Sequence, residues 1–208
     1  MGKFLLHIKR LELCRSIVLR LLNKFDFVLA IEGNTGCLTG DTVIRYSRGH
    51  NARTIPLKKL YNFNERAKNG NADIKFNPKI PTFIRAYNDK EIRLHKLKDV
   101  FYSGKKQVYQ LILEDGKSIK ATADHKFLTL NKEWKQLKDL KIGDAILCDT
   151  PKPVKIKSII EKGIEDTYDI ECEDPYHNFI ANDIIVHNSG KSTLAIEVAR
   201  GVASEFRR

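Results

Sequence analysis

The sequence has few cysteines, and their spacing does not suit a metal site. Its four cysteines are Cys14, Cys37, Cys148 and Cys172, and they contain no C-x-x-C pair and no zinc-type spacing. We therefore expect no metal site and no disulfide framework. Free thiols of this kind suit a reducing compartment, so we expect a cytoplasmic location.

No apolar run in the sequence approaches the length of a membrane span. The apolar residues near the N-terminus recur at helical spacing, and charged residues such as Lys9, Arg10 and Arg20 interrupt them. No signal-peptide cleavage pattern follows this N-terminal segment. We therefore expect residues 1–25 to form a helix that packs on a neighbouring sheet, and we expect no membrane partner.

The sequence has no concentrated block of charge, although its net charge is +11. Lysine and arginine alternate with aspartate and glutamate along most of the chain. A dispersed pattern of this kind is typical of a solvated basic surface rather than of a nucleic-acid groove. We therefore expect no specific nucleic-acid partner for the middle of the chain.

The chain does contain a phosphate-binding loop, and this loop is cut in two. An apolar strand at residues 27–31 precedes the first part, and a helical pattern follows the second part. The two parts consist of Gly33, Asn34, Thr35 and Gly36, and of Ser189, Gly190, Lys191, Ser192 and Thr193. Joined directly, they give the G-x-x-x-x-G-K-S motif in its strand–helix context. Residues 37–188 are therefore interpreted as an insert between two segments, 1–36 and 189–208.

The insert differs in character from its α/β flanks, because it consists mainly of short runs with high β propensity. The expected strands are Thr42–Tyr46, Arg53–Ile55, Thr82–Tyr87, Ile92–Phe101, Gln107–Leu113, Ser118–Ala121, Lys126–Leu130, Ala145–Cys148, Val154–Glu161, Thr167–Glu171, Phe179–Ala181 and Ile184–Val186. Turns are expected at Ser103-Gly104 and Lys162-Gly163. Short helices are expected at Leu57–Tyr61 and Trp134–Leu140, with a loop at Asn62–Pro81.

The insert also contains an internal repeat. A shift of 59 positions places Val100 on Ile159, Gly104 on Gly163, Tyr109 on Tyr168, Leu111 on Ile170, Glu114 on Glu173 and Asp115 on Asp174. Six matches in one register favour a duplicated β unit. A duplicated unit predicts a pseudo-two-fold arrangement, which would bring the two distant ends of the insert together.

Five sequence blocks of the insert resemble the motifs of inteins, which are self-splicing protein domains. These blocks are Cys37, Thr122–Thr129, Tyr168–Glu171, His177–Asn182 and Val186–Ser189. The resemblance covers the whole of residues 37–188 and implies a mainly β, Hint-type horseshoe fold, which inteins share with Hedgehog autoprocessing domains. The size is similar to that of a mini-intein, and no LAGLIDADG-type endonuclease motif is found.

The resemblance implies a role for each end of the insert. Cys37 follows Gly36 directly, and a thiol is the best natural nucleophile at neutral pH. It would attack the Gly36 carbonyl and form a thioester, after which Ser189 would attack this thioester. Asn188 would then cyclise through its side-chain amide and release the insert. The assisting residues that the resemblance implies are Thr122 and His125 at the first bond, His187 and His177 at the last bond, and Asp169 between them.

The expected product restores the phosphate-binding loop by joining Gly36 to Ser189. Lys191 would then reach the phosphates of ATP and Ser192 would hold Mg²⁺ in the complete host protein. We expect the fragment itself to lack ATPase activity, because no acidic strand for the metal follows in the sequence. Splicing itself is expected to need no cofactor and no partner.

Two other functions are compatible with parts of the sequence. One is a P-loop nucleotide-binding protein with a permanent β-domain insertion. The other is a Hedgehog-like domain that passes its thioester to an outside nucleophile. The sequence His187-Asn188-Ser189 argues against the Hedgehog-like domain, which would need no C-terminal asparagine with a nucleophile after it. A gel of fresh protein would separate splicing, with two products, from a permanent insertion, with one band.

Overall fold

The computed structural model describes residues 36–49, 51–68, 81–150, 152–173, 175 and 177–188. The helix predicted at residues 1–25, the strand at 27–31 and the C-terminal helical pattern lie outside these described residues. Thr35–Ser189 form one compact unit. Within the described ranges, no helix has the length and apolar content needed to cross a bilayer.

The described unit is built mainly of antiparallel strands. They are β1 (Leu38–Thr39), β2 (Val43–Arg48), β3 (Asn51–Pro56), β4 (Phe83–Tyr87), β5 (Ile92–Leu113), β6 (Ser118–Ala121), β7 (Lys126–Leu128), β8 (Trp134–Gln136), β9 (Ala145–Leu147), β10 (Pro153–Cys172), β11 (Asn178–Ala181) and β12 (Ile184–His187). The helices are α2 (Leu57–Lys68) and the short 3₁₀ helix η1 (Leu137–Asp139). The predicted mainly β horseshoe is confirmed.

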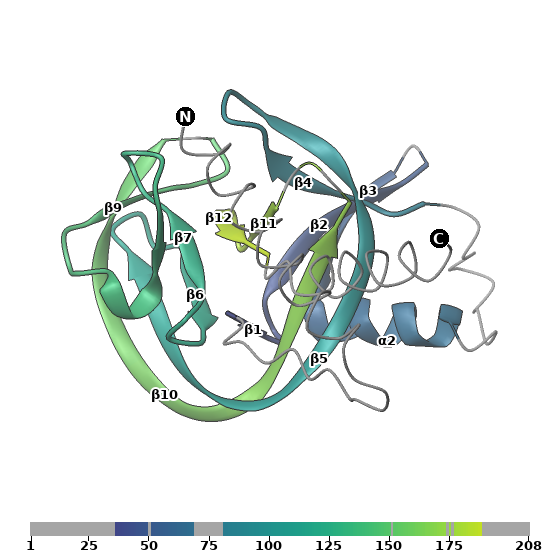
Figure 1. Cartoon of the computed structure of the whole chain (residues 1–208), viewed down its shortest axis with the longest axis horizontal. Coiled ribbons are helices and arrows are strands. Elements are labelled where there is room, and N and C mark those ends of the chain that lie inside the picture. Colours follow the sequence, from purple (N-terminus) through teal and green to yellow (C-terminus); the bar gives the residue numbers. More distant parts are fainter. Residues whose placement is uncertain are drawn as a thin grey trace, which may run out of the picture. The chain divides into compact units, whose positions relative to one another are not determined.

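The strands form one continuous sheet in the order β8-β7-β12-β11-β2-β4-β5-β6-β1-β10-β9, and β3 pairs with β2. β5 and β10 are the longest strands and run side by side as a curved ribbon, which is visible along the lower edge of Figure 1. The inner faces of the strands bury an apolar core that includes Leu38, Ile44, Ile84, Val100, Leu111, Phe127, Ile156, Ile170, Phe179 and Val186. Each such side chain contributes about 1.5–3 kcal/mol by leaving water, so this core stabilises the curved sheet.

The register of β5 on β10 is symmetric under the 59-residue shift. Val100 pairs with Ile170, and the shifted equivalents of these residues, Ile159 and Leu111, pair with each other. The only pair that maps onto itself is Lys106 with Glu165. The predicted duplication is therefore confirmed, and its pseudo-two-fold axis passes between Lys106 and Glu165.

The two turns predicted at Ser103-Gly104 and Lys162-Gly163 are wrong. β5 and β10 continue through these glycines, and the register of their pairing shifts by one residue at each. Gly104 has φ +84° and Gly163 has φ +90°, values that glycine adopts without steric cost. The glycines therefore mark two β-bulges, which bend a strand without ending it.

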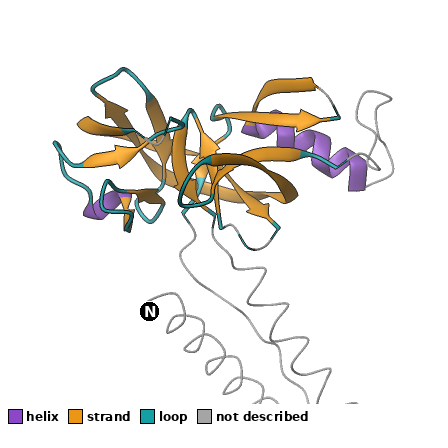
Figure 2. Ribbon diagram, turned by 90° about the horizontal axis from the view of Figure 1, so that it is seen from above, coloured by secondary structure: helices purple, strands orange, loops and turns teal. Residues whose placement is uncertain are grey.

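The two predicted helices also differ from the observed ones. α2 begins at Leu57 as predicted and continues to Lys68, through residues that were predicted to be a loop. Leu57 and Leu60 are completely buried and Phe63 packs against the same core, so the contact of α2 with the sheet continues past the predicted end of the helix. Figure 2 shows α2 along one end of the sheet. The helix predicted at Trp134–Leu140 is instead β8 followed by η1.

A tight hairpin carries the C-terminal end of the unit. Asn182 and Asp183 connect β11 to β12 and have φ of 47° and 61°. The Asn182 side chain accepts a hydrogen bond from the Val43 amide at 2.6 Å and donates one to the Ser118 carbonyl at 2.8 Å. These contacts join the hairpin to two other parts of the sheet. They thereby fix the start of β12 against the rest of the sheet.

Candidate functional site

Cys37 lies immediately before β1 and is completely buried. Its backbone amide donates a hydrogen bond to Thr122 Oγ1 at 2.9 Å. In return, the Thr122 amide donates to the Cys37 carbonyl at 3.0 Å. Two hydrogen bonds therefore hold the Cys37 backbone against the loop that contains Thr122, and one of them contacts the nitrogen of the Gly36–Cys37 bond.

Gly36 packs against the backbone of His125. A Cβ at Gly36 would lie 2.2 Å from the Cα of His125 and 2.8 Å from its backbone nitrogen. Backbone atoms cannot move away as the end of a flexible side chain can. The structure therefore accepts only glycine before Cys37, and it brings the Gly36–Cys37 bond next to His125.

The His125 ring is completely enclosed and packs edge-on against Phe127, with ring centroids 5.4 Å apart. Burial lowers the pKa of His125 to about 4; the nearby Gly36 backbone opposes this shift, and the charge of His187 adds to it. Among the described residues, neither ring nitrogen has a partner that satisfies both the distance and the angle of a hydrogen bond. The ring is neutral at pH 7, and a neutral imidazole can both donate and accept a proton.

Lys106 is a contact of Cys37 that the sequence motifs do not indicate. Its ammonium nitrogen donates a hydrogen bond to Cys37 Sγ at 3.2 Å from the centre of β5. Nothing in the local pattern of this lysine distinguishes it from its many neighbours. Its central position in the repeat was the one signal that could have drawn attention to it.

At the other end of the unit, the His187 Nδ1 contacts the backbone carbonyl oxygen of Asn188. The His187 ring also packs edge-on against Trp134 of β8, with ring centroids 4.8 Å apart. Burial lowers the pKa of His187 to about 4, and the Asn188 carbonyl opposes this shift. The His187 ring therefore lies on the carbonyl of the Asn188–Ser189 bond.

Asn188 is buried and is held on both its backbone and its side chain. Its backbone amide donates to the His177 carbonyl at 3.0 Å. With the side-chain amide turned so that its nitrogen faces His177, it donates to that carbonyl at 2.8 Å and accepts from the Cys172 amide at 3.3 Å. The contact of His177 with Asn188 is therefore made by the backbone carbonyl of His177.

Asp169 and Cys172 lie on β10 between the two ends of the unit. Asp169 is buried, and its carboxylate accepts the Ile170 amide at 2.9 Å. Burial raises the pKa of Cys172 to about 12, with a further rise from Asp169 and Glu171. The Cys172 thiol is therefore protonated at neutral pH and serves as a packed core residue.

The two ends of the unit meet around the same elements. β1 pairs with β10 at Leu38–Tyr168, and Asn188 contacts Cys172 at the end of β10. β12 pairs with β7 directly after His125, and the charge of His187 acts on His125. A cysteine, an asparagine and two neutral histidines, one buried and one half-buried, thus surround two peptide bonds at the ends of one β unit. This arrangement defines a domain that processes its own polypeptide chain.

Several predicted residues lie outside the described part of the chain. They are Gly33, Asn34, Thr35, Ser189, Gly190, Lys191, Ser192 and Thr193. Within the described ranges, no group of three or more histidine, cysteine or acidic side chains could hold a metal ion.

Comparison with known proteins also indicates a domain that processes its own polypeptide chain. The sequence model of the family "Intein splicing domain" matches residues 82–162. The structure is similar to that of a DnaB intein from Synechocystis sp. PCC 6803, with 33% identity, a TM-score of 0.60, 74% of this chain covered and 99% of that chain. It is also similar to the Ssp DnaB mini-intein variant M86, with 32% identity, a TM-score of 0.61, and 76% and 98% of the two chains covered.

A curated relative is the replicative DNA helicase DnaB of Rhodothermus marinus, 34% identical over 113 residues, which are 53% of this chain and 10% of the relative. The chain thus spans about a tenth of the length of this relative. With a third of its residues identical to those of a solved intein that it covers almost completely, the chain belongs to the intein family. Its activity is autocatalytic protein splicing.

Proposed function

We propose that residues 37–188 excise themselves and join Gly36 to Ser189 through a thioester, a branched ester and a succinimide. In the first step, Cys37 Sγ attacks the Gly36 carbonyl carbon and the Gly36–Cys37 bond breaks. The leaving nitrogen gains the proton that sulfur gives up. The hydrogen bond from this nitrogen to Thr122 and the packing of His125 on Gly36 support the step.

The second step transfers the Gly36 acyl group from Cys37 sulfur to the Ser189 hydroxyl oxygen. The serine proton moves to the sulfur, so atoms and charge balance. A hydroxyl is a poor nucleophile and needs a nearby base and accurate placement. We propose that Asp169 orients these groups, because its buried carboxylate lies on β10 between the two ends of the unit.

In the third step, the Asn188 side-chain nitrogen attacks the Asn188 carbonyl carbon, and the bond to Ser189 breaks. The proton that the attacking amide loses passes to the leaving Ser189 nitrogen. The contact of His187 Nδ1 with the Asn188 carbonyl oxygen is the observation that supports this step best. His187 would polarise this carbonyl, and His177 would fix the amide through its own carbonyl. A final acyl shift from oxygen to nitrogen leaves an ordinary peptide bond between Gly36 and Ser189.

The host of this insert is proposed to be a P-loop protein that binds ATP and Mg²⁺ after splicing. The proposal rests on the residues that would be joined, which complete a Walker A loop. In that loop, Gly33 to Gly36 and Ser189 to Thr193 would line the phosphates. The match to a protein named as a replicative DNA helicase agrees with a host of this kind. Domain bounds of 1–36, 37–188 and 189–208 follow from this proposal.

Splicing itself is proposed to need no cofactor, no partner and no nucleic acid, and to take place in the cytoplasm. The test uses the purified chain with EDTA present. The expected result is two products on a gel and in mass spectrometry, one being ligated 1–36/189–208 and the other residues 37–188. A single stable band at the mass of the whole chain, in every buffer, would favour the permanent insertion instead.

A further inference from the structure

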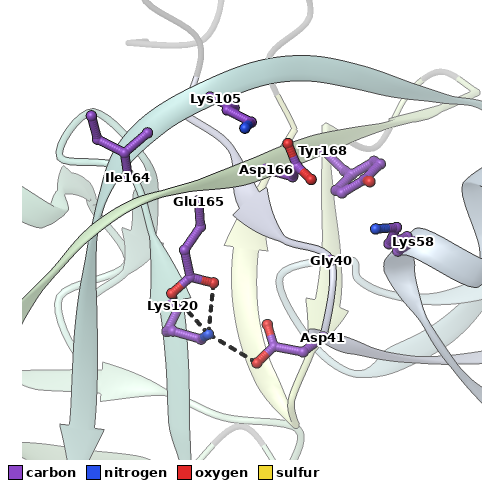
Figure 3. Close-up of a pocket in the computed structure, with 9 residues that line it drawn as sticks. All are labelled: Gly40, Asp41, Lys58, Lys105, Lys120, Ile164, Glu165, Asp166 and Tyr168. Carbon is purple, nitrogen blue, oxygen red and sulfur yellow. Dashed lines mark hydrogen bonds and ion pairs between the residues drawn. The ribbon is translucent and has the colours of Figure 1, made fainter.

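Lys106 and Glu165 occupy equivalent positions at the pseudo-two-fold axis of the β5–β10 ribbon. The backbone geometry at the two positions is therefore alike, while their charges are opposite. The Glu165 carboxylate is bound by Lys120, with distances of 3.0 and 2.8 Å to its two oxygens. Lys120 also pairs with Asp41 at 3.1 Å, and Figure 3 shows this group of three side chains.

The pairing of Glu165 with Lys120 matters for Lys106. A carboxylate opposite Lys106 would normally attract its ammonium group away from other contacts. Here that carboxylate is bound by another lysine, and Lys106 donates to Cys37 Sγ at 3.2 Å. The structure thus places a half-buried cation beside the sulfur that performs the first step.

We propose that Lys106 is a catalytic residue of the first step, in which its ammonium group stabilises Cys37 as the thiolate. The proposal rests on the proposed thioester mechanism. The Cys37 thiol gives up its proton, and the sulfur forms a bond to the Gly36 carbonyl carbon. As the carbon–nitrogen bond breaks, the leaving nitrogen gains the proton that the sulfur gave up. Lys106 acts through its charge and transfers no proton.

An ammonium group suits this position because the thiolate is the reactive form and a nearby cation stabilises it. A hydrogen bond to a charged group is about twice as strong as a neutral one, and more so out of water. Cys37 is completely buried, so solvent does little to stabilise a negative sulfur there. Lys106 therefore supplies, through its contact with the sulfur, the stabilisation of negative charge that solvent does not.

Other charged or titratable groups lie on the elements packed around Cys37. β10 contributes Glu165 and Asp169, of which Glu165 is paired with Lys120 of β6. The Asp169 carboxylate accepts the Ile170 amide. The loop before β7 contributes His125, whose ring is neutral above a pH of about 4.

Lys105 provides a matched control for Lys106. It is the preceding residue of β5, and successive side chains of a strand point to opposite faces. Its side chain lines a cavity of about 460 Å³ together with Asp166 and Tyr168 (Figure 3). A change at Lys105 alters the charge of the same strand without removing the contact to Cys37.

The test measures the release of residues 1–36 by a thiol reagent, in an Asn188→Ala background that isolates the first step. Lys106→Met, Lys106→Arg and Lys105→Met are compared from pH 6 to pH 10. We expect Lys106→Met to be about 10- to 100-fold slower at pH 7, because negative charge then develops on the sulfur without a cation beside it. The difference in rate between Lys106→Met and the Asn188→Ala parent should become smaller towards pH 10. Lys106→Arg should retain most of the parent rate. Lys105→Met should react within about twofold of the parent rate.

The outcomes separate this proposal from the mechanism on which it rests. If the Asn188→Ala parent releases no N-terminal segment, the thioester mechanism itself is wrong. If the parent reacts and Lys106→Met reacts equally fast, the role of Lys106 is refuted. A loss of rate that is the same at every pH, or that Lys105→Met shares, would also overturn it, because a merely structural residue would behave in that way.

Discussion

The two ends of the splicing unit hold their reacting groups in different ways. Cys37 is held by partners far away in the sequence, since Thr122 is 85 residues away and Lys106 is 69 residues away. At the other end, His187 contacts the carbonyl of the next residue, and Asn188 bonds to His177 at the far side of one hairpin. The hydrogen bonds at the first bond thus come from residues distant in the sequence, whereas those at the last bond come from within residues 172–188.

This difference has a consequence for how the two steps fail. A change that loosens the contact between β5, β10 and the Thr122 loop should impair thioester formation and spare asparagine cyclisation. A change in the β11–β12 hairpin should do the reverse. The following predictions test this separation.

The largest effects should come from removing either reacting side chain. Cys37→Ala should abolish thiol-induced release of residues 1–36 while leaving slow cleavage after Asn188. Asn188→Ala should abolish that cleavage while leaving the thioester. Mass spectrometry of both variants distinguishes the products. Complete splicing by either variant would contradict the mechanism.

His125→Ala should slow thioester formation by about 10²- to 10⁴-fold, which is the usual contribution of a positioned acid–base group. The reason is that His125 packs on Gly36 beside the bond that breaks. The rate is measured by hydroxylamine release in the Asn188→Ala background. Cyclisation of Asn188, followed in a Cys37→Ala background, should change much less, and an equal loss at both ends would argue against separate sites.

Gly36→Ala should slow the first step by about 10²-fold, since a displacement of about 1 Å at a reacting bond has an effect of this size. The added Cβ would lie 2.2 Å from the Cα of His125, so the junction must shift. The same release assay measures it. Gly40→Ala adds a Cβ near Lys58 and Tyr168 side chains instead and is the comparison variant. Should both variants splice at the parent rate, the packing argument fails.

Acid should destabilise the fold through His125. Its pKa is about 4 in the folded chain and near 6.5 when unfolded, so the unfolded chain binds more protons between these values. The stability from the neutral ring is therefore complete above pH 6.5 and falls towards pH 4, by about 2 kcal/mol at pH 4.5. Urea unfolding of the Cys37→Ala protein at pH 7 and 4.5 measures the loss. His125→Phe should reduce it, and an unchanged pH dependence would disprove the assignment.

The smallest expected effect concerns Trp134. Its ring packs edge-on against His187, and such aromatic pairs contribute about 0.5–1.5 kcal/mol beyond burial. Trp134→Leu should therefore slow cleavage after Asn188 by about two- to tenfold and leave thioester formation unchanged. Parallel time courses of the two cleavages provide the measurement. A slower first step would show that the two ends are not independent.

Much of the fold could be predicted because its signals are visible in the sequence itself. These signals are the short runs with high β propensity and the 59-residue repeat. The repeat even predicts which residues of β5 and β10 are equivalent. Gly104 and Gly163 were misinterpreted because a glycine with positive φ serves equally in a turn and in a bulge. Only the neighbouring strand decides between them.

The candidate site was predictable only in part. The residues at Thr122, His125, His187 and Asn188 belong to recognisable motifs, and the structure brings them close to the two reacting bonds. The contact of Lys106 with Cys37 depends on the curvature of a 22-residue strand. No pattern within a few residues of Lys106 encodes that curvature, so the local sequence does not predict the contact.

The lack of space for a side chain at Gly36 limits the positions in a host protein at which this insert can splice. Under the proposed ligation, Gly36 belongs to the host and remains in the host after excision. The insert therefore depends on a residue that it does not encode. A phosphate-binding loop is a favourable insertion site, because its glycines let the backbone approach the phosphates. The host therefore cannot easily replace these glycines. Selection on the host for nucleotide binding would then preserve the glycine that the insert needs for splicing.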